Sequence, residues 1–386
     1  MPSKTSHHND HGGGSLSTKF DAIVVGGGIV GCACAYYLSQ SFQRVLVIEP
    51  GPIGGASTAA GMGHIVVMDD SPAQFALTYY SQQLWTGLVS QMPADCEYRP
   101  TGTMWVAADD EEFSHVEGKR KFYESNGVKA EVLSPAELAK AEPQLRDGLA
   151  GGLRIPSDSV IYPVTAAGWL LSEAKRNGAE LIQGKRATKM GQRSVHLEDG
   201  TQFEADFVIN AAGGHAPLLT PGLPIEPRKG HLVITDRYPG FVHHQLIELG
   251  YLKSAHEMSS ESVAFNAQPR ATGQILLGSS RQFVGWNSEV DRKLVTKMVN
   301  RAAEYLPGIQ QLSGIRIWTG FRATTPNKLP IIGAMPEDPS LLIAAGHEGL
   351  GITTSLATGK LIADWASGSK SVIDPAPYIP GGHHEH

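Results

Sequence analysis

The sequence predicts a mixed α/β fold in which a unit built on a parallel sheet is interrupted by a second, mostly antiparallel sheet. Three observations support this prediction. A glycine-rich turn follows a short apolar run near the N-terminus. Several strand-like segments follow one another between residues 224 and 283. A strand-like segment and an apolar helix then return over 341–365, so the first unit is completed at the C-terminal end.

The first unit begins with an apolar run over 21–25, which is typical of a buried parallel strand. Small and apolar residues at helical spacing predict a helix over 32–39, and 44–48 predicts a second strand. The turn between the first strand and the helix reads Gly26-Gly27-Gly28-Ile29-Val30-Gly31, and Glu49 ends the second strand. A G-x-G-x-x-G turn between strand and helix, followed by an acidic residue, is the pattern of a dinucleotide-binding site.

Each residue type in this turn has a physical role. Gly26 permits the tight turn, and Gly31 lets the helix pack closely on the strand. Gly28 lets a pyrophosphate approach free amides at the helix N-terminus, where the helix dipole favours anions. Glu49 can accept hydrogen bonds from an adenosine ribose and would repel a 2′-phosphate. The alternative interpretation is an ordinary glycine-rich turn of an α/β protein.

Composition limits the class of protein. The chain of 386 residues has 41% hydrophobic and 18% charged residues and a net charge of −6, which is typical of a globular protein of two domains. This charge gives no reason to expect nucleic acid or an acidic membrane surface as a partner. The chain has no run of eighteen apolar residues and no signal-peptide core in its first nineteen residues, so we expect a cytoplasmic location, or peripheral attachment at the inner membrane.

Cysteine and histidine usage predicts no metal site. Cys32, Cys34 and Cys96 are too few and too badly spaced for a disulfide framework or a zinc site, so we expect reduced, inert thiols. The histidine-rich segments 1–19 and 371–386 are expected to be disordered tails.

The remaining elements are predicted in chain order. The segment 51–63, rich in glycine, alanine and serine, is expected to lack regular structure. Ser71 caps a helix over 71–88, and Ser134 opens another with a capping box. Further predictions are strands at 98–108 and 202–211, a helix at 164–177, antiparallel strands at 224–235, 245–253, 262–268 and 274–283, a helix at 291–305, short buried strands at 315–319 and 341–345, and a closing helix at 352–365.

This order predicts interleaved domains. A coenzyme-binding domain comprises 20–90, 150–223 and 315–370, and a substrate domain comprises 91–149 and 224–314. An ordinary nicotinamide dehydrogenase keeps its dinucleotide-binding unit contiguous. The interleaving therefore favours an FAD-binding fold with an inserted substrate domain.

Three further stretches carry the cofactor prediction. In 55–64, the hydroxyls of Ser57 and Thr58 can bond a pyrophosphate, and small residues let backbone amides reach a flat ring. The strand 208–214 ends in small residues beside which a nucleotide can pass. The third stretch combines 320–333, which contains Arg322, with the glycine-rich helix entry at 345–353.

With these stretches, the chain resembles the D-amino-acid oxidase superfamily, which includes glycine oxidase and sarcosine oxidase, over roughly residues 20–370. Residues 62–74 and 278–281 are most similar to the bacterial D-hydroxyproline dehydrogenases and a related cyanide-synthase oxidase subunit. The resemblance implies a Rossmann-like FAD-binding domain of the glutathione-reductase type. It also implies non-covalent FAD, because no cysteine lies near Arg322, where some sarcosine oxidases tether their flavin.

The resemblance implies roles for individual residues. Arg322 binds the substrate carboxylate, since a guanidinium fork fixes both charge and orientation. Met62, His64 and Gly349 lie at the flavin and substrate. Further candidates for substrate contacts in the inserted sheet are Tyr251, Lys253, His243, His244 and Arg281. The predicted cofactor-binding residues are Gly26, Gly28, Ile29, Val30, Gly31, Glu49, Pro50, Ser57, Thr58, Ala60, Gly61, Met62, Gly63, Ala187, Ala211, Ala212, Gly213, Arg322, Gly346, His347, Gly349, Leu350, Gly351, Ile352 and Thr353.

These roles lead to a hypothesis for the reaction. A D-amino acid, preferably cis-4-hydroxy-D-proline or D-proline, transfers a hydride from its α-carbon to flavin N5 and leaves as an imine. The electrons pass to a quinone, a respiratory chain or oxygen. Two alternatives stay open: a glycine or sarcosine oxidase that uses oxygen directly, and a flavin subunit that works only inside a heteromeric complex. A homo-oligomer or a hetero-oligomer is compatible with the sequence.

Overall fold

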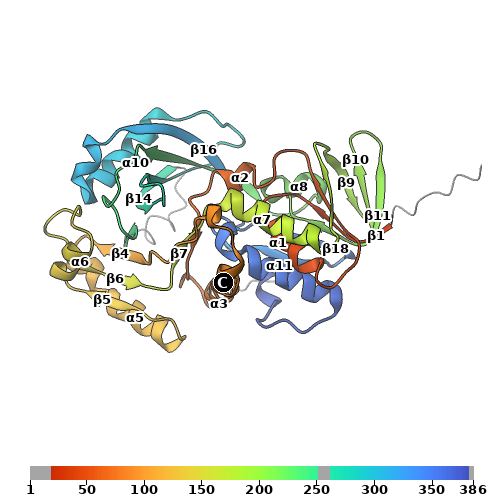
Figure 1. The fold of residues 1–386 in the computed structure, drawn as a ribbon, viewed down its shortest axis with the longest axis horizontal. Helices are drawn as coiled ribbons and strands as arrows, with labels where there is room; N and C mark the ends of the chain where they lie inside the picture. Colours follow the sequence, from red (N-terminus) through yellow and green to blue (C-terminus); the bar gives the residue numbers. More distant parts are fainter. Residues whose placement is uncertain (1–18, 251–260, 382–386) are drawn as a thin grey trace, which may run out of the picture.

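The computed structural model describes residues 19–250 and 261–381. Within these residues two eight-stranded sheets lie beside each other along the long axis of the molecule (Figure 1), and a two-stranded ribbon of β3 (His64–Ile65) and β7 (Ser159–Val160) accompanies them. The predicted α/β fold with a second, mostly antiparallel sheet is confirmed.

The first sheet is mostly parallel. Its main strands, in order across the sheet, are β17 (Ile331–Met335), β18 (Asp338–Ala345), β11 (Gln202–Asn210), β1 (Lys19–Val25), β2 (Val45–Glu49) and β8 (Glu180–Gln183). Only β17 runs antiparallel to its neighbour along this path. Because β1 is buried on both faces from Ala22 to Val25, this part of its sequence is a continuous apolar run rather than an alternating one.

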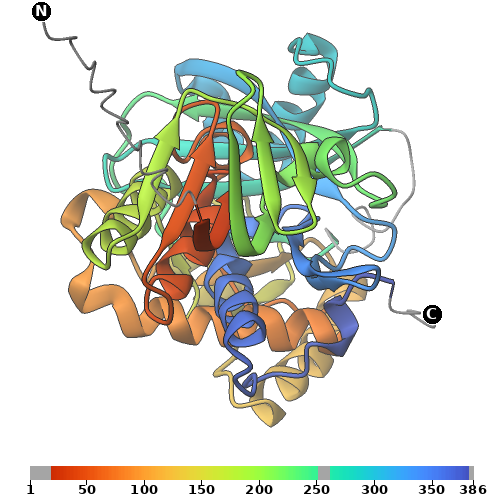
Figure 2. The same cartoon turned by 90° about the vertical axis from the view of Figure 1, so that its right-hand side faces the viewer.

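Different layers cover the two faces of this sheet. Ala22 and Val24 pack with a helical layer, whose members are α1 (Ile29–Leu38), α3 (Pro72–Leu88), α7 (Pro163–Arg176) and α11 (Gly351–Ser367). Ile23 and Val25 pack on the other side with the hairpin of β9 (Ala187–Gly191) and β10 (Ser194–Leu197) and with the short α8 (Ala216–Leu219). Figure 2 shows this end of the molecule, with α11 in blue near β1 in red.

The second sheet is antiparallel except where β13 runs parallel to β4. Its strands, in order, are β16 (Gly314–Thr324), β12 (Glu226–Thr235), β15 (Ile275–Gln282), β14 (Glu261–Pro269), β13 (Gln245–Glu248), β4 (Thr103–Ala107), β6 (Gly151–Ile155) and β5 (Glu131–Leu133). Helix α10 (Arg292–Tyr305) covers one face, where Tyr305 stacks on Phe265 with 4.6 Å between ring centroids. The peripheral helices are α4 (Asp110–Ser114), α5 (Val116–Ser125) and α6 (Pro135–Ala141).

Strand pairing differs from the predicted domain boundaries at two places. Strands β6 and β16 belong to the second sheet, although 150–223 and 315–370 were assigned to the coenzyme-binding domain. A strand was predicted at 315–319 and is present, but the prediction that it is buried is wrong. Ile315 and Ile317 are 56% and 45% exposed on the edge strand β16. Apolar residues on an edge strand produce the same sequence pattern as a buried strand.

Several local predictions are also corrected or confirmed. The segment 51–63 contains a one-turn helix, α2 (Ala56–Ala59), and the strand expected at 98–108 is limited to β4. Ser71 caps α3 by accepting a hydrogen bond from the Gln74 amide, and the capping box of Ser134 and Glu137 at α6 is present.

The predicted C-terminal tail is partly wrong. Tyr378 is 1% exposed, and its hydroxyl donates to the carbonyl of Ala73 at 2.5 Å, so the chain packs against α3 at this point. The predicted tails at 1–18 and 382–386 lie outside the described residues.

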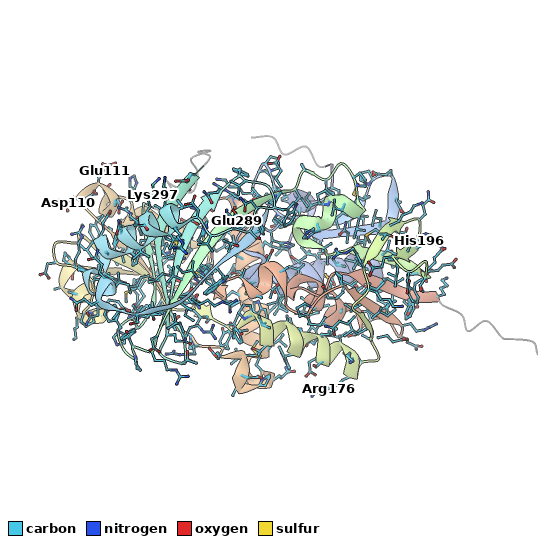
Figure 3. All side chains as sticks on the ribbon, turned by 90° about the horizontal axis from the view of Figure 1, so that it is seen from above. Asp110, Glu111, Arg176, His196, Glu289 and Lys297 are labelled. Atoms are coloured by element: carbon cyan, nitrogen blue, oxygen red, sulfur yellow. The ribbon has the colours of Figure 1, made fainter. Side chains whose placement is uncertain are left out.

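The surface and the core agree with the composition. Charged side chains such as Asp110, Arg176 and Lys297 lie on the outside of the molecule (Figure 3). The three cysteines are free and buried, and burial raises the pKa of each thiol, as expected for inert groups. Among the described helices, none combines the length and apolar character that a membrane span requires.

Candidate active site

The N-terminal glycine turn lies where β1, α1 and the end of β11 meet. Gly26 has a φ of +117°, and a Cβ atom there would lie 2.4 Å from the Ala211 carbonyl oxygen. A Cβ on Gly31 would lie 1.9 Å from the carbonyl oxygen of Gly26. Side chains are therefore excluded at both positions by close backbone approach.

Two side chains fix the loops around this turn. The Ile29 amide donates to Thr58 Oγ1 at 3.0 Å, which joins α2 to the start of α1. Glu49 accepts hydrogen bonds from the amides of Gly27 at 2.6 Å and Gly51 at 2.7 Å, one on each carboxylate oxygen. Each oxygen has a further lone pair, so the predicted ribose contact at Glu49 is compatible with these bonds.

Segment α2 also contacts the edge strand of the second sheet. The Ser57 hydroxyl donates to the carbonyl of Phe321 at 2.5 Å, and the Trp318 indole donates to the carbonyl of Ala60 at 3.4 Å. A Cβ on Gly320 would lie 2.4 Å from the Cβ of Ala60, so the Ala60 side chain packs directly against the Gly320 backbone. These contacts bring Arg322 next to the predicted flavin-binding residues Ala60 to Gly63.

The N-terminus of α11 is the second cofactor-binding element. The first intrahelical bond runs from the Thr354 amide to the Leu350 carbonyl, so the amides of Gly351, Ile352 and Thr353 precede it. Leu350 at the N-cap provides no capping side chain. Thr353 instead donates from its hydroxyl to the carbonyl of His64 at 2.8 Å, which ties α11 to the short strand β3.

His347 has a structural environment. Its Nε2 lies 3.0 Å from the hydroxyl of Thr358, and burial lowers the pKa of the imidazole to about 3. It is therefore neutral at physiological pH and holds the turn before α11.

These elements fit FAD. The helices α1 and α11 both begin without a capping side chain from their own N-cap residue. At Gly28 a Cβ would lie 3.3 Å from Thr58 Oγ1, so glycine keeps that surface open. The amides and dipole of α1 suit a pyrophosphate, and those of α11 suit the negative edge of a flavin.

Other predicted cofactor residues are spread around the same region. Ala211, Ala212 and Gly213 follow β11, and Gly346 (φ +82°) follows β18. Pro50 is exposed after β2, and Ala187 begins β9 within the core cluster that contains Val25. Their contacts with the cofactor remain predictions.

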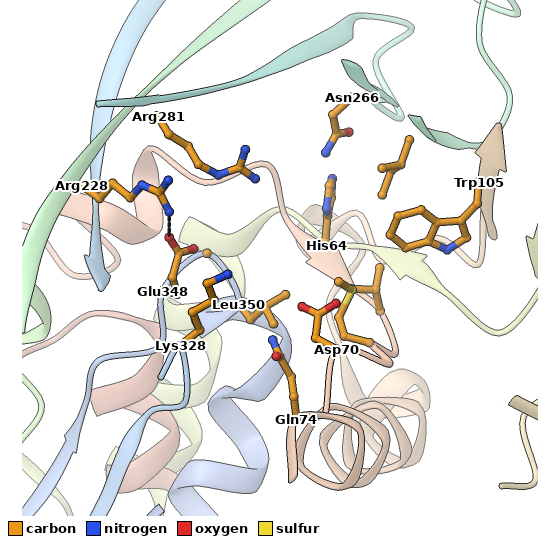
Figure 4. Close-up of a pocket in the computed structure, with 14 residues that line it drawn as sticks. His64, Asp70, Gln74, Trp105, Arg228, Asn266, Arg281, Lys328, Glu348 and Leu350 are labelled. Atoms are coloured by element: carbon orange, nitrogen blue, oxygen red, sulfur yellow. Dashed lines mark ion pairs between the residues drawn. The ribbon is translucent and has the colours of Figure 1, made fainter. Parts of the chain in front are cut away.

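A pocket of about 110 Å³ lies between the second sheet and the short strand β3, which contains His64 (Figure 4). Five neighbouring strands, β12, β15, β14, β13 and β4, each contribute one residue to its wall. The residues that line the pocket are His64, Val66, Met68, Asp70, Gln74, Trp105, Arg228, Ile247, Asn266, Arg281, Lys328, Glu348, Gly349 and Leu350.

One end of this pocket is rich in charge. Arg228 and Arg322 are paired in register across β12 and β16. The Glu348 carboxylate lies between them, with Oε1 3.5 Å from Arg228 Nη1 and Oε2 3.9 Å from Arg322 Nε. Arg281 and Lys328 also line this end. Burial lowers the pKa of Arg228 and of Lys328, and Glu348 opposes this shift at Arg228.

The opposite end is apolar and neutral. Trp105 and Ile247, which are register partners on β4 and β13, form part of its surface. Burial lowers the pKa of His64 to about 4, so its imidazole is neutral at physiological pH.

The structure brings several predicted substrate residues together at this pocket. His64, Arg281 and Gly349 line it, together with Leu350, which was predicted as a cofactor-binding residue. Arg322 lies beside it, because a Cβ on Gly349 would be 3.5 Å from Arg322 Nε.

Met62 lies close by and is held through its backbone, because its carbonyl accepts a hydrogen bond from Gln268 Nε2 at 2.7 Å. Its sulfur would lie 3.2 Å from a Cβ on Gly278.

Other predicted substrate residues lie elsewhere. His243 and His244 do not line the pocket, since both backbone amides and the His244 ring bind the buried carboxylate of Glu142. Two adjacent histidines in a predicted substrate domain look like ligands in sequence, but here they compensate a buried charge. Tyr251 and Lys253 lie outside the described residues.

Several lining residues were not predicted from the sequence, namely Asp70, Gln74, Trp105, Arg228, Asn266, Lys328 and Glu348. Arg228 and Asn266 could have been predicted as site residues, because each is a strongly polar residue inside a segment predicted as a strand of the second sheet. Buried polar residues in strands are uncommon unless they have a partner or a ligand.

Comparisons with known proteins agree with this site. The model of the family described as FAD dependent oxidoreductase (DAO) matches residues 21–365. Glycine oxidase of Pseudomonas putida is 28% identical, with 93% of this chain and 98% of that protein covered. Hydrogen cyanide synthase subunit HcnC of Pseudomonas aeruginosa is 26% identical, with 94% and 96% covered.

A solved structure shows the same fold. The crystal structure of glycine oxidase from Geobacillus kaustophilus superposes with a TM-score of 0.85 at 24% identity, and the match covers 95% of this chain and 100% of the other. The chain therefore belongs to the FAD-dependent oxidoreductase (DAO) family. Its cofactor is FAD, and the predicted class of enzyme is confirmed.

Proposed function

We propose that this protein oxidises a D-amino acid to the corresponding imine, with cis-4-hydroxy-D-proline or D-proline as the preferred substrate, and passes the electrons to an acceptor. The observation that carries the proposal is the cluster of cations at one end of a small pocket, directly beside the N-terminus of α11. A substrate carboxylate fits this end, because three cations and two carboxylates among the lining residues leave a positive balance.

Arg322 is the proposed anchor of the substrate carboxylate. Its Nη1 donates to the carbonyl of Ser280 at 3.0 Å, which fixes the guanidinium against β15. The pocket-lining residues Arg281 and Arg228 lie on the same sheet and add positive potential. A guanidinium held in this way orients the carboxylate and thereby the bond between the α-carbon and its hydrogen.

The rest of the pocket protects the reaction. Trp105, Ile247 and Val66 exclude water from the neutral end. FAD, when bound, supplies the two-electron acceptor for the hydride of the α-carbon. No protein base is needed if the substrate amine arrives neutral, which agrees with the low pKa that burial gives to His64.

The test is anaerobic reduction of the bound flavin. Purified holoenzyme is mixed without oxygen with single D- and L-amino acids, including glycine, sarcosine, both proline enantiomers and the 4-hydroxyproline epimers. Loss of flavin absorbance near ~450 nm reports reduction, since that colour belongs to the cofactor. The proposal predicts the fastest bleaching by cis-4-hydroxy-D-proline or D-proline. Faster bleaching by L-amino acids or by glycine would contradict it.

Two alternatives follow from the relatives. The similarity to glycine oxidase favours an oxidase that uses oxygen, in which case substrate turnover consumes oxygen and releases peroxide. The similarity to HcnC, which is named as a subunit, favours a flavin-bearing component of a larger complex. In that case the isolated chain shows no turnover with amino acids and artificial dyes, although it binds FAD.

A further inference from the structure

Two polar side chains with buried, unpaired atoms meet at the neutral end of the pocket. His64 comes from β3 and Asn266 from β14, and Figure 4 shows their tips pointing toward one another. Asn266 is 5% exposed, and its register partners are Ile247 on β13 and Gly278 on β15, so it lies in the centre of the pocket wall.

Each of these side chains has an unsatisfied atom. Among the described residues, the buried atoms His64 Nε2 and Asn266 Oδ1 have no hydrogen-bond partner. Leaving a buried polar atom unpaired is costly, and native proteins normally provide a partner in protein, water or ligand. Two such atoms that line the same pocket indicate one polar group between them.

The chemistry of the wall restricts what that group is. Trp105 and Ile247, which lie beside Asn266 in the sheet, carry no charge, and His64 is itself neutral. A negatively charged ligand group would meet no cation at this end, because the lining cations Arg228, Arg281 and Lys328 lie at the other end and the further lining charge, Asp70, is itself a carboxylate (Figure 4). A hydroxyl satisfies the site, because it donates one hydrogen bond and accepts others, and neutral imidazole and amide groups offer both roles.

We infer that Asn266 and His64 form a hydroxyl-recognition pair, so that the preferred substrate is an amino acid with a hydroxyl group on the side opposite its carboxylate. This inference rests on the proposed function for its substrate class. In this arrangement the substrate carboxylate lies at the arginine end of the pocket and its hydroxyl lies at the end that contains Asn266. The part of the substrate between these two groups is apolar. A site built to bond a hydroxyl rejects the analogue that lacks it, because its own polar atoms then stay unpaired.

The first experiment compares pairs of substrates that differ by one hydroxyl. Rates of anaerobic flavin reduction in the holoenzyme are measured with 4-hydroxyproline and proline and with serine and alanine, in both configurations. We expect kcat/KM to favour the hydroxylated member of the productive pair by at least ~10-fold. Equal values, or a preference for the analogue without the hydroxyl, would overturn the inference, because a retained water would then be filling the gap.

The second experiment assigns this preference to Asn266. Asn266→Leu keeps the volume and removes the hydrogen-bonding group, so the ratio between the two substrates should fall by ~10-fold toward unity. Most of that fall should come from slower reaction of the hydroxylated substrate. If Asn266→Leu does not fold, Asn266→Ala and His64→Leu provide the same comparison, because each removes a hydrogen-bonding group from the pair.

Ser262→Ala is the matched control. Ser262 lies on the same strand, β14, and its hydroxyl is also buried without a partner among the described residues, but it does not line the pocket. The substrate ratio of this variant should equal that of the unaltered protein. An unchanged ratio in Asn266→Leu, or an equal loss in Ser262→Ala, would remove Asn266 from substrate recognition.

A binding measurement separates this inference from the proposed function. Butyrate and 4-hydroxybutyrate lack the amine and cannot be oxidised to an imine, so they report recognition alone. Their dissociation constants follow from the change in flavin absorbance of the holoenzyme. A preference for the hydroxylated acid that disappears in Asn266→Leu supports the inference even if no amino acid reduces the flavin. Reduction by amino acids without any hydroxyl preference in rate or binding refutes the inference and leaves the proposed function intact.

Discussion

Arg228 and Arg322 are register partners on β12 and β16, and the carboxylate of Glu348 lies between their guanidinium groups. Like charges directly opposite on neighbouring strands repel, so this arrangement needs the intervening carboxylate. Glu348 is held in place by its own backbone, since its amide donates to the Ala323 carbonyl at 2.9 Å with a φ of +49°. The charged end of the pocket is therefore a compensated cluster that a second carboxylate can enter.

Arg322→Leu should weaken substrate binding strongly. The substitution removes the proposed carboxylate anchor, and loss of one partner of a charged hydrogen-bonded pair costs about 2–4 kcal/mol. We expect kcat/KM to fall by about 30- to 1000-fold, with most of the effect in KM. Steady-state kinetics with the best substrate of the anaerobic panel measures this.

Arg316→Leu is the control for that experiment. Arg316 lies on the same strand but is exposed, and its guanidinium stacks on Trp318 instead of facing the pocket. Its kinetic constants should stay close to those of the unaltered protein. If Arg322→Leu behaves in the same way, the anchor is another cation of the cluster.

Glu348→Gln should lower the thermal stability of the protein and raise its affinity for a carboxylate ligand. Without the carboxylate, Arg228 and Arg322 repel each other, and the melting temperature of the holoenzyme should fall. Because the negative charge of Glu348 is gone, the two arginines should bind a carboxylate ligand several-fold more tightly. Titration with butyrate measures this change. Glu337→Gln, an exposed site on the turn before β18, controls for the loss of one negative charge. Weaker butyrate binding in Glu348→Gln would show that Glu348 orients the arginines more than it competes with the ligand.

Gly28→Ala should separate cofactor binding from folding. Gly28 has a φ of −69°, which alanine adopts easily, and the added Cβ would lie 3.3 Å from Thr58 Oγ1. The protein should therefore fold, while the methyl group occupies the surface that we assign to the pyrophosphate. FAD affinity, measured by flavin fluorescence during titration of the apoprotein, should fall at least ~10-fold, with a nearly unchanged circular dichroism spectrum. Retained affinity would place the pyrophosphate elsewhere.

Gly31→Ala provides the contrast. Its Cβ would lie 1.9 Å from the Gly26 carbonyl oxygen, which neither backbone can avoid without moving. We expect this variant to lose both folded protein and FAD binding. A variant that folds normally would show that α1 can shift away from β1.

The sequence predicted the first unit well because its elements are local. The glycine turn, its two flanking strands and Glu49 lie within 21–49, where apolar periodicity and glycine spacing specify both structure and ligand. The helix starts at Ser71 and Ser134 were predictable for the same reason, since the capping hydroxyl and the backbone amide that donates to it are three residues apart.

The pocket was less predictable because it depends on register between distant strands. Arg228, Asn266 and Trp105 become neighbours only when β12, β14 and β4 pair in one sheet, and pairing leaves no local signal in the sequence. The histidines at 243 and 244 show the opposite error. Their partner Glu142 is about a hundred residues away, so a structural role could not be distinguished from a catalytic one.

Asp158 gives the protein a predictable dependence of stability on pH. It is 1% exposed, and its Oδ1 accepts hydrogen bonds from Gln82 Nε2 at 2.9 Å and the Val67 amide at 3.2 Å. Burial raises the pKa of this carboxyl to about 7 from an ordinary value of 3.8. Between these two values the folded state keeps a proton that the unfolded state releases, so the free energy of unfolding falls as the pH rises from about 4 to 7.

Asp158→Asn should remove that dependence. Asparagine retains an acceptor for Gln82 and Val67 and carries no charge, so the variant should be more stable than the unaltered protein at pH 8, by about 2–4 kcal/mol. The two proteins should converge as the pH falls to 4 and below, where Asp158 becomes protonated in the unfolded state as well as in the folded state. Urea unfolding of the holoenzyme at both pH values measures the difference. Asp199→Asn is the control, and its effect on the free energy of unfolding should have the opposite sign. The reason is that the pKa of the exposed Asp199 carboxyl beside Lys185 is lowered, not raised. A variant Asp158→Asn that is less stable at pH 8 would mean that the ionised carboxylate is stabilised in the folded protein, and that burial is not the dominant influence at this site.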